Sequence, residues 1–390
     1  MINKNKDRGI TLVALVITII ILLILATISI QSLTNTGLFQ KAQEAKEKTQ
    51  NAEENQAKTL NEYEDELNKY ISGDVKKPVK KVSDNIGSVL STTDNTELED
   101  AYGNKIIVPA GFKIVSDSTT NNAQTVNQGI VIEDATKTAE GTATSTSGSQ
   151  FVWIPVVKIY TDVAKTDANA KTIELNRYTF DSNGKPTAQG EKVIETYYSE
   201  TASKGNTVAK DINAFKTSVA TNGGYYIGRY EARTTTARTA EGNALTQITE
   251  KGTDQIYNYV KQPQAAKLSQ EMYNSNKFTS DLMNSYARDT TTVFLQTCGT
   301  NSKYSRQNSV NTTLSQTGTN TQSTKDVQCN VYDMASNTRE WTTETCSYYG
   351  DPCVVRGGSY NDSSIYTSYR YGDSTSNSDG YIGFRPLLFV

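Results

Sequence analysis

The sequence contains no histidine. Ser-His-Asp and Cys-His catalysis and all histidine-ligated metal sites are therefore excluded. Cysteine is scarce as well, with four residues, and no two of them form the CxxC pair that is typical of a zinc site. Cys346 and Cys353 flank a turn-like segment and are the best candidates for a disulfide, whereas buried free thiols are the alternative.

A basic face is also lacking. The 39 Lys and Arg residues are outnumbered by 42 Asp and Glu residues, which leaves a net charge of −3 and a pI near 5.4. A nucleic-acid partner would require a basic surface, so we expect none. Only 7 residues are proline, whereas glycine, serine, threonine and asparagine are abundant, as in loop-rich secreted domains. A length of 390 residues exceeds that of one ordinary domain.

Charge is missing altogether from residues 10–30, which read ITLVALVITIIILLILATISI. As a helix this run would be about 30 Å long, the thickness of the hydrocarbon core of a bilayer. Basic residues precede the run, and the next charged residue is Lys41. The length and apolarity of the run predict a transmembrane helix at 10–30 in contact with membrane lipid, and the charge asymmetry predicts its orientation. We therefore expect a single-pass protein of the cell membrane with a cytoplasmic N-terminus before processing and an extracellular C-terminal head.

The start of this run resembles the class III signal of type IV pilins and pseudopilins. The matching residues are Gly9, Ile10, Thr11 and Leu12. In that family a prepilin peptidase cleaves after the glycine and methylates the new N-terminus. The resemblance implies a leader peptide at 1–9, prepilin peptidase as a partner, and Gly9 and Ile10 as the processing site. Pilins usually carry Glu where this chain has Ala14, which puts incorporation into a filament in doubt. A plain signal-anchor helix is the alternative.

Residues 31–72 are expected to form a charged helical stalk. Small or apolar residues recur there at spacings of three and four, and Glu44 and Lys48 are one of several oppositely charged pairs four residues apart. A linker at 73–100 and a head at 101–390 are expected to follow. In the head, strand-like segments occur at 105–108, 112–115 and 151–157, and a helix is expected at 280–297.

Three motifs near the C-terminal end carry a second resemblance. They are Asn330–Thr342 (NVYDMASNTREWT), Arg356–Ser359 (RGGS) and Gly383–Arg385 (GFR). Together they resemble the sulfatase-modifying-factor (formylglycine-generating enzyme) family, with its GN-x-WEW, RGGSW and GFR signatures. The resemblance covers about 151–390 and is strongest at 330–390. It implies an α+β fold with a loop-rich, C-type-lectin-like head, and some members of this family are non-enzymatic binding proteins.

The resemblance also bears on catalysis and on metal binding. The family oxidises a cysteine of a client sulfatase with a pair of reactive cysteines, one of them directly after the GFR motif. Pro386 occupies that position here, so we expect no enzyme, with a formylglycine-generating oxidase as the alternative. The family's bound calcium is a candidate cofactor. The resemblance implies Asn337 and Glu340 as its oxygen ligands, and the alternative is that both residues only cap and bridge turns.

Tyrosine and small polar residues dominate the segment between the RGGS and GFR motifs. A tyrosine ring provides a large contact area at low entropic cost, so this composition predicts a binding surface for an extracellular protein or glycan. The residues expected to contact the ligand are Tyr360, Asn361, Asp362, Ser364, Tyr366, Tyr369, Tyr371 and Asp373. A tyrosine-rich edge without a special ligand is the alternative.

The same residue types suggest how the surface could vary. Some lectin-like proteins of this kind are targets of diversity-generating retroelements, which randomise adenines in AAC-type codons near the end of the gene. Changes at such codons give the Tyr, Asn, Asp, Ser, Ile and Thr found at 360–371. A low-complexity polar loop, like the one at 301–325, is the alternative. The function expected overall is recognition or adhesion by a membrane-anchored, pilin-like surface protein, and a minor pilin or pseudopilin subunit is a further alternative.

Overall fold

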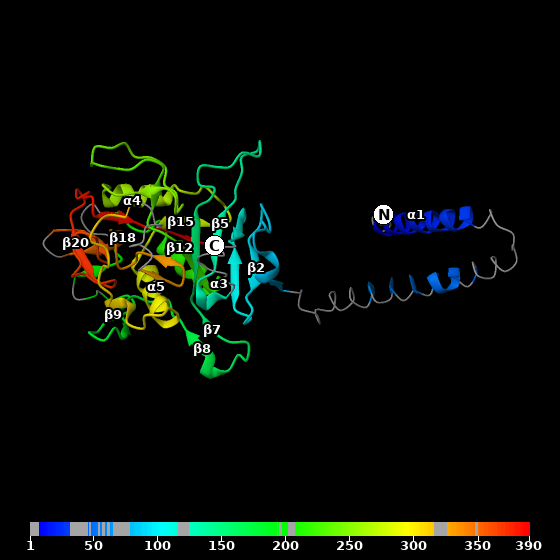
Figure 1. Ribbon diagram of the computed structural model, residues 1–390, viewed down its shortest axis with the longest axis horizontal. Coiled ribbons are helices and arrows are strands. Elements are labelled where there is room, and N and C mark those ends of the chain that lie inside the picture. Colours follow the sequence, from blue (N-terminus) through cyan, green and yellow to red (C-terminus); the bar gives the residue numbers. More distant parts are fainter. Residues whose placement is uncertain are drawn as a thin grey trace, which may run out of the picture. The chain divides into compact units, whose positions relative to one another are not determined.

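The computed structural model describes residues 8–31, 46, 48–53, 55–56, 59–60, 63–64, 79–115, 125–192, 194, 197–201, 207–315, 326–347 and 350–390. The chain divides into two compact units, Met1–Pro78 and Val79–Val390 (Figure 1). We describe each unit by itself.

The first unit is helical wherever it is described. Helix α1 spans Arg8–Gln31 and includes the expected processing site, and the described residues between 46 and 64 are helical, as predicted for the stalk. Leu22 and Leu23 on α1 are 60% and 64% exposed. Among the described residues, no helix combines the length and the apolarity that a membrane crossing requires. The segment 10–30 is thus confirmed as a helix but not as a membrane span. Residues 1–7 of the expected leader, 32–45 and 65–72 of the expected stalk, and 73–78 of the expected linker lie outside the described residues.

The second unit is a mixed α+β structure. Its strands are β1 (Lys80–Lys81), β2 (Thr96–Glu99), β3 (Lys105–Val108), β4 (Phe112–Ile114), β5 (Val131–Asp134), β6 (Gln150–Pro155), β7 (Lys158–Tyr160), β8 (Ala170–Thr172), β9 (Tyr178–Phe180), β10 (Pro186–Ala188), β11 (Tyr198–Ser199), β12 (Gly224–Gly228), β13 (Arg233–Thr234), β14 (Gln255–Ile256), β15 (Thr279–Leu282), β16 (Val327–Gln328), β17 (Val331–Tyr332), β18 (Arg339–Cys346), β19 (Cys353–Arg356), β20 (Arg370–Asp373), β21 (Ile382–Phe384) and β22 (Pro386–Phe389). Its α-helices are α3 (Ile212–Asn222), α4 (Gln262–Gln270) and α5 (Ser285–Cys298), and its 3-10 helices are η1 (Ser83–Asn85), η2 (Val126–Gln128), η3 (Asp167–Asn169) and η4 (Tyr304–Arg306).

A six-stranded antiparallel sheet in the order β15-β22-β12-β6-β5-β4 forms the centre of this unit. Successive side chains of a strand point to opposite faces of a sheet. Phe151 and Trp153 of β6 accordingly join one hydrophobic core, whereas Val152 and Ile154 join another. Helices α3 and α5 contribute apolar side chains to the second core. The sheet is therefore covered on both faces, which explains why its strands read as nearly continuous apolar runs.

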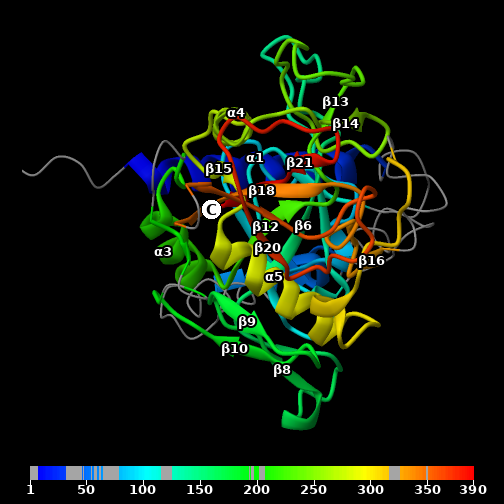
Figure 2. The same cartoon turned by 90° about the vertical axis from the view of Figure 1, so that its left-hand side faces the viewer.

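A second sheet carries the sequence motifs. Its order is β11-β18-β19-β20, and β21 pairs with β18 in parallel. Trp341 of β18 is fully buried in the first core and donates its indole N–H to the carbonyl oxygen of Val260 at 2.8 Å. Figure 2 shows the β9–β10 hairpin beside α5, close to β20. Strand β20 thus forms the edge at which the predicted ligand-binding segment lies.

Two sequence expectations are corrected here. Residues 79–100 do not act as a linker, because Val82 and Leu98 are fully buried in the first core and β2 pairs with β3. The compact head therefore begins at Val79 and not at residue 101. The helix expected at 280–297 begins only at Ser285, after the N-cap Asn284, because residues 279–282 form β15 against β22. The expected strands at 105–108, 112–115 and 151–157 are confirmed as β3, β4 and β6.

Candidate ligand-binding site

The predicted contact residues lie on one segment that follows the RGGS motif and runs into β20. All eight are at least partly exposed, and Tyr371 is the most exposed large side chain among them at 46%. Thr367, Ser368 and Arg370, which alternate with them, are buried. The tyrosines of this segment therefore face outward, and the buried residues between them anchor the segment to the head.

Tyr366 and Tyr369 form the centre of the site. Their ring centroids are 5.5 Å apart and the ring planes are nearly perpendicular at 84°, the edge-to-face geometry that aromatic pairs favour. The guanidinium carbon of Arg306 lies 4.1 Å from the centroid of the Tyr366 ring. These three side chains and Phe180 help to line a small pocket with a volume of about 60 Å³. Arg306 comes from η4, so the site combines segments that are distant in the sequence.

Arg339 lies beside the central tyrosines. Its guanidinium carbon is 5.4 Å from the ring centroid of Tyr371 and 5.8 Å from that of Tyr381, and its Nη2 donates to Oδ2 of Asp362 at 3.3 Å. The pKa of the Asp362 carboxyl is lowered, mainly by hydrogen bonds from Ser364 and further by the positive charge of Arg339. Burial raises the pKa of the Tyr369 hydroxyl, which therefore stays protonated at neutral pH.

The remaining predicted residues lie at the periphery. Asp373 accepts hydrogen bonds from the backbone N–H of Ser374 at 2.7 Å and from Asn377 Nδ2 at 2.8 Å, so it stabilises a turn. Asn361 is exposed, and Ser364 donates its hydroxyl to Asp362 at 2.6 Å. Tyr360 is partly exposed. We call the central group the tyrosine–arginine surface, and its members are Arg306, Arg339, Asp362, Tyr366, Tyr369, Tyr371 and Tyr381.

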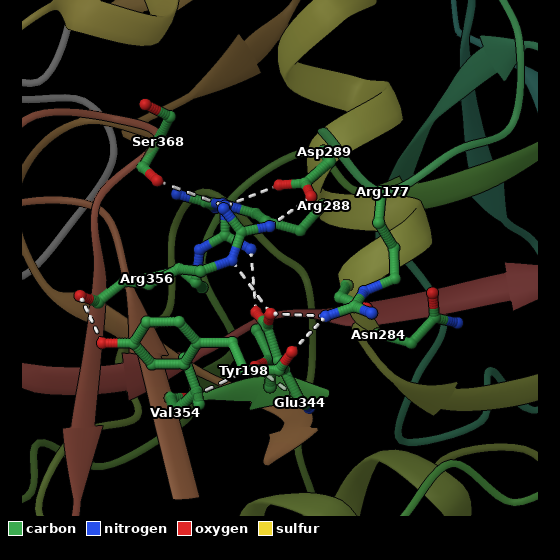
Figure 3. Close-up of polar contacts among 12 residues, drawn as sticks. Arg177, Tyr198, Asn284, Arg288, Asp289, Glu344, Val354, Arg356 and Ser368 are labelled. Atoms are coloured by element: carbon green, nitrogen blue, oxygen red, sulfur yellow. Dashed lines mark hydrogen bonds and ion pairs between the residues drawn. The ribbon is translucent and has the colours of Figure 1, made fainter. Parts of the chain in front are cut away.

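Figure 3 shows part of a buried ionic cluster that includes Arg177, Asp289, Glu344 and Arg356. Asp289 of α5 contacts Arg356 of β19 at 2.6 Å and also pairs with Arg370 of β20. Glu344 of β18 contacts Arg356 at 3.1 Å, Arg370 at 2.9 Å and Arg177 at 3.3 Å. All five side chains are nearly or fully buried. The two carboxylates thereby link α5 to three neighbouring strands, and each charge that is removed from water has a partner.

The same cluster holds the backbone of the tyrosine segment. Arg356 Nε donates to the carbonyl oxygen of Tyr369 at 3.2 Å, and its Nη2 donates to that of Ser368 at 3.4 Å. Thr367 donates its hydroxyl to the carbonyl oxygen of Tyr304 at 2.6 Å. These contacts fix the direction in which the neighbouring tyrosines point. The arginine of the RGGS motif therefore has a structural role.

A second buried cluster is built around Glu340. Its carboxylate pairs with Arg288 and, at 2.6 Å, with Arg385 of the GFR motif. Arg385 also donates to the carbonyl oxygens of Gly228 at 2.9 Å and Tyr332 at 2.7 Å. Gly357 of the RGGS motif has φ +79°, and a Cβ there would lie 2.8 Å from Arg288 Nη2. Arg288 thus connects the two motifs, because it pairs with the Glu340 carboxylate that Arg385 also contacts and packs against Gly357. The positive φ and this close approach require glycine at position 357.

The two residues that the resemblance implies as calcium ligands, Asn337 and Glu340, have protein partners in this structure. Both oxygens of Glu340 are bonded to arginines, whose positive charges occupy the place that a cation would need. Asn337 accepts the backbone N–H of Ser315 through Oδ1 at 2.8 Å and donates Nδ2 to Glu231. Asn337 thus connects the segment before β18 to Glu231 and to the loop at Ser315. Among the described residues, no group of three or more acidic or cysteine side chains is arranged to hold a metal ion.

Two of the four cysteines, Cys346 and Cys353, are buried, and the other two, Cys298 and Cys329, are partly exposed. Cys353 of β19 is fully buried, and burial raises the pKa of its thiol to about 12. Cys346 of β18 is also buried, and the residue opposite Cys353 is Thr345. Burial raises the pKa of the Cys298 thiol to about 12 as well, so neither Cys298 nor Cys353 is a thiolate at neutral pH.

Three side chains of the surface were not among the predicted contacts. Arg306 belongs to a part of the chain that looked like a polar loop, and only the fold brings it to Tyr366. Arg339 occupies the position of the first Trp in the GN-x-WEW signature of the family. A charged residue at that position suggests a local difference in function, so this substitution was the sequence signal that could have identified Arg339 as part of the surface. Tyr381 has its hydroxyl bonded to Asp379, which raises its pKa to about 12.

Comparison with known proteins identifies part of the head. Residues 264–388 match the model of the sulfatase-modifying factor enzyme 1-like domain. No curated protein and no solved structure matches the chain. The matched range contains the RGGS and GFR motifs and every predicted contact residue, whereas the resemblance expected at 151–263 is not covered. Residues 264–388 are thus similar to the sulfatase-modifying factor enzyme 1-like domain.

Proposed function

We propose that the head is a recognition module that binds an external protein through the tyrosine–arginine surface. The observation that carries this proposal is the position of Arg339, which lies within 6 Å of two tyrosine rings and contacts Asp362. Tyrosine and arginine are enriched among the residues that dominate binding energy at protein interfaces. A rigid backbone beneath them lowers the entropic cost of binding.

A protein ligand accounts for the surface better than a small molecule. The pocket at Tyr366 and Tyr369 has a volume of about 60 Å³, which is small compared with the several hundred Å³ of typical small-molecule sites. It can receive a single side chain or functional group, while the rings around it provide a broader contact area. The positive charge of Arg306, which lines this pocket, favours an acidic side chain in that position.

Binding without chemistry is the second part of the proposal. Oxidation of a sulfatase cysteine in the manner of the family requires a reactive cysteine after the GFR motif, where this chain has Pro386. The nearest cysteine along the chain before the GFR motif, Cys353, is buried and protonated. The purified protein should therefore leave a cysteine-bearing sulfatase peptide unchanged, as mass spectrometry would detect. Conversion that is lost in Cys353→Ser would contradict this part.

The third part concerns location and rests on the sequence alone. The uncharged run at 10–30 and the residues Gly9 and Ile10 support a protein that prepilin peptidase processes and that membrane lipid then retains at the cell surface. Cells that express the full chain with the peptidase should yield a mature protein beginning with a methylated Ile10, and Gly9→Val should block this cleavage. Ala14 favours a free surface protein over a filament subunit, so purified filaments should lack the chain.

Binding is tested with the full chain against a panel of purified surface proteins. A ligand of the proposed kind should bind the wild type and lose affinity when Tyr366 and Tyr369 are both replaced by Ala. Tyr160→Ala, on the β7 strand, is a matched control that should retain affinity. Equal binding by both variants would place the interaction elsewhere on the head.

A further inference from the structure

A long groove lies on the head apart from the tyrosine–arginine surface. It has a volume of about 820 Å³, and threonine, serine, asparagine and glutamine side chains form most of its lining. The groove is formed by the loop before β2, the loop after β5, and the segment between α4 and β15. We call it the hydroxyl groove. Its volume is typical of sites for small or extended ligands.

A chain of oriented hydroxyl groups runs along one wall of the groove. Thr136 donates its hydroxyl proton to Oδ1 of the buried Asp134 at 2.6 Å, and Tyr273 donates to Oδ2 of Asp134 at 3.1 Å. The hydroxyl of Thr144 is 2.8 Å from that of Thr136. A hydroxyl has only one proton, so Thr144 must be the donor in this pair. The Thr146 hydroxyl lies 3.3 Å from the Thr144 oxygen and must then donate to it, which leaves one lone pair of Thr144 as an acceptor. Thr144 is partly exposed to the groove.

Gln247 provides a hydrogen-bond donor in the same groove. Ser145 donates its hydroxyl to Oε1 of Gln247 at 2.6 Å, which fixes the orientation of the amide. The Nε2 group of this exposed side chain can then donate two hydrogen bonds. An acceptor at Thr144 and a donor at Gln247 therefore lie in the lining of the same groove. Neighbouring hydroxyl groups of a ligand, each of which both donates and accepts, would match this pair.

The floor of the groove is aromatic. Tyr273 is partly exposed, and its ring centroid lies 5.4 Å from that of Phe278 and 5.8 Å from that of Phe112. Phe278 and Phe112 are buried, so they fix the tyrosine ring from below. An apolar ring beside oriented polar groups suits the C–H faces of a sugar.

The charges of the groove argue against an ionic ligand. Among the described residues that line it, Lys277 alone is charged, and its Nζ is paired with Asp94 at 3.0 Å. The carboxylate of Asp134 lies behind the hydroxyl chain and would repel an anion. Lys251 contributes its Nζ to the carbonyl oxygen of Ser145 at 3.2 Å and so stabilises the wall.

We infer that the hydroxyl groove is a second binding site, and that its ligand is a neutral oligosaccharide. The sugar hydroxyls bond to Thr144 and Gln247, and a sugar ring packs against Tyr273. This site uses none of the residues of the tyrosine–arginine surface, so a test of the hydroxyl groove is independent of a test of the function proposed above.

The test is an array of neutral and acidic oligosaccharides probed with the full chain, followed by titration calorimetry with the strongest neutral binder. Thr144→Val keeps the shape of the side chain and removes its hydroxyl, and it should weaken binding about fivefold to tenfold. Asn274→Trp places a large ring in the groove at an exposed position and should abolish binding. Thr172→Val, on an exposed strand outside the groove, is the matched control and should bind like the wild type.

Four results would overturn the inference. The first is the absence of binding to every neutral oligosaccharide on the array. The second is binding that survives both Thr144→Val and Asn274→Trp in variants with wild-type melting temperatures. The third is binding that is lost in Tyr366→Ala, because this would assign the sugar to the tyrosine–arginine surface. Binding of acidic oligosaccharides alone would also contradict it.

Discussion

The guanidinium group of Arg356 lies 2.6 Å from the carboxylate of Asp289, and both side chains are fully buried beneath the tyrosine segment. Arg356 belongs to the RGGS motif and Asp289 to α5, 67 residues earlier in the chain. This pair joins the second sheet to the central helix and holds the carbonyl oxygens of Ser368 and Tyr369. The orientation of the proposed binding residues therefore depends on the buried ion pair between Arg356 and Asp289.

Removing one charge from this cluster should destabilise the head strongly. Glu344→Gln removes the charge that pairs with Arg177, Arg356 and Arg370, of which only Arg356 and Arg370 also pair with Asp289. Breaking a buried ion pair costs about 3–5 kcal/mol. Urea denaturation followed by circular dichroism would measure this loss. Glu97→Gln removes the partner of Lys105 in an exposed pair and should cost less than about 1 kcal/mol. Similar losses for the two variants would contradict the proposed role of the cluster.

Loss of the two central tyrosines should affect binding and spare stability. Tyr366 and Tyr369 are only partly buried and contact each other, so replacing both with Ala removes contact area that faces the ligand. We expect affinity for a protein ligand to fall at least about thirtyfold, as for residues that dominate an interface. The melting temperature should stay close to that of the wild type. A large fall in melting temperature would instead identify the rings as part of the core.

Arg339 should be sensitive even to a conservative change. A lysine keeps the charge, but it lacks the planar group that contacts two rings and Asp362 together. Arg339→Lys should therefore weaken ligand binding about tenfold or more, while the free energy of unfolding changes by less than about 1 kcal/mol. Binding is measured by calorimetry and unfolding by urea titration. Unchanged affinity would remove Arg339 from the site.

Stability should fall as the pH rises from about 4 to 7. The pKa of the Asp281 carboxyl is raised to about 6 by burial, although Gln270 and two backbone N–H groups donate to it. The folded state therefore holds this proton more tightly than the unfolded state. The resulting stability is complete below the unfolded pKa and is lost as the pH passes through 6. Asp281→Asn should remove a pH-dependent change on the order of 3 kcal/mol, measured by denaturation at pH 4, 6 and 7.5.

The control for this pH effect is Asp167→Asn, because that carboxylate is 95% exposed. It should preserve the decline of stability with pH. Equal pH profiles for the wild type and Asp281→Asn would show that other carboxyls dominate. Glu231 would then be the next candidate, since burial raises its pKa to about 7.

Natural sequence variation in the tyrosine segment between the RGGS and GFR motifs should occur at exposed positions. If a retroelement diversifies the gene, related isolates should differ at adenine positions in the codons of Asn361, Tyr366 and Tyr371, whose side chains face outward. The codons of Thr367 and Arg370 should stay constant, because these side chains are buried and bonded. Sequencing the end of the gene across isolates provides the measurement. Variation spread evenly over exposed and buried positions would contradict diversification.

Much of the fold could be predicted because local patterns report local structure. The strands at 105–108 and 112–115 were evident from their apolar residues. The RGGS and GFR motifs indicated the family to which the comparison finds residues 264–388 similar. The exposure of the tyrosine segment also followed from composition, since Tyr, Asn and Ser at such density do not form a core. These features depend on residues that are close together in the chain, so the sequence alone is sufficient to predict them.

The partners of the charged residues were decided only by the tertiary structure. The fold places Arg288 and Arg385 against Glu340, although they are 52 and 45 residues away from it in the chain. Arg306 could be read as part of a polar loop until η4 brought it over Tyr366. An ionic or aromatic contact depends on distance in space, and the sequence by itself determined only which side chains were present to make it.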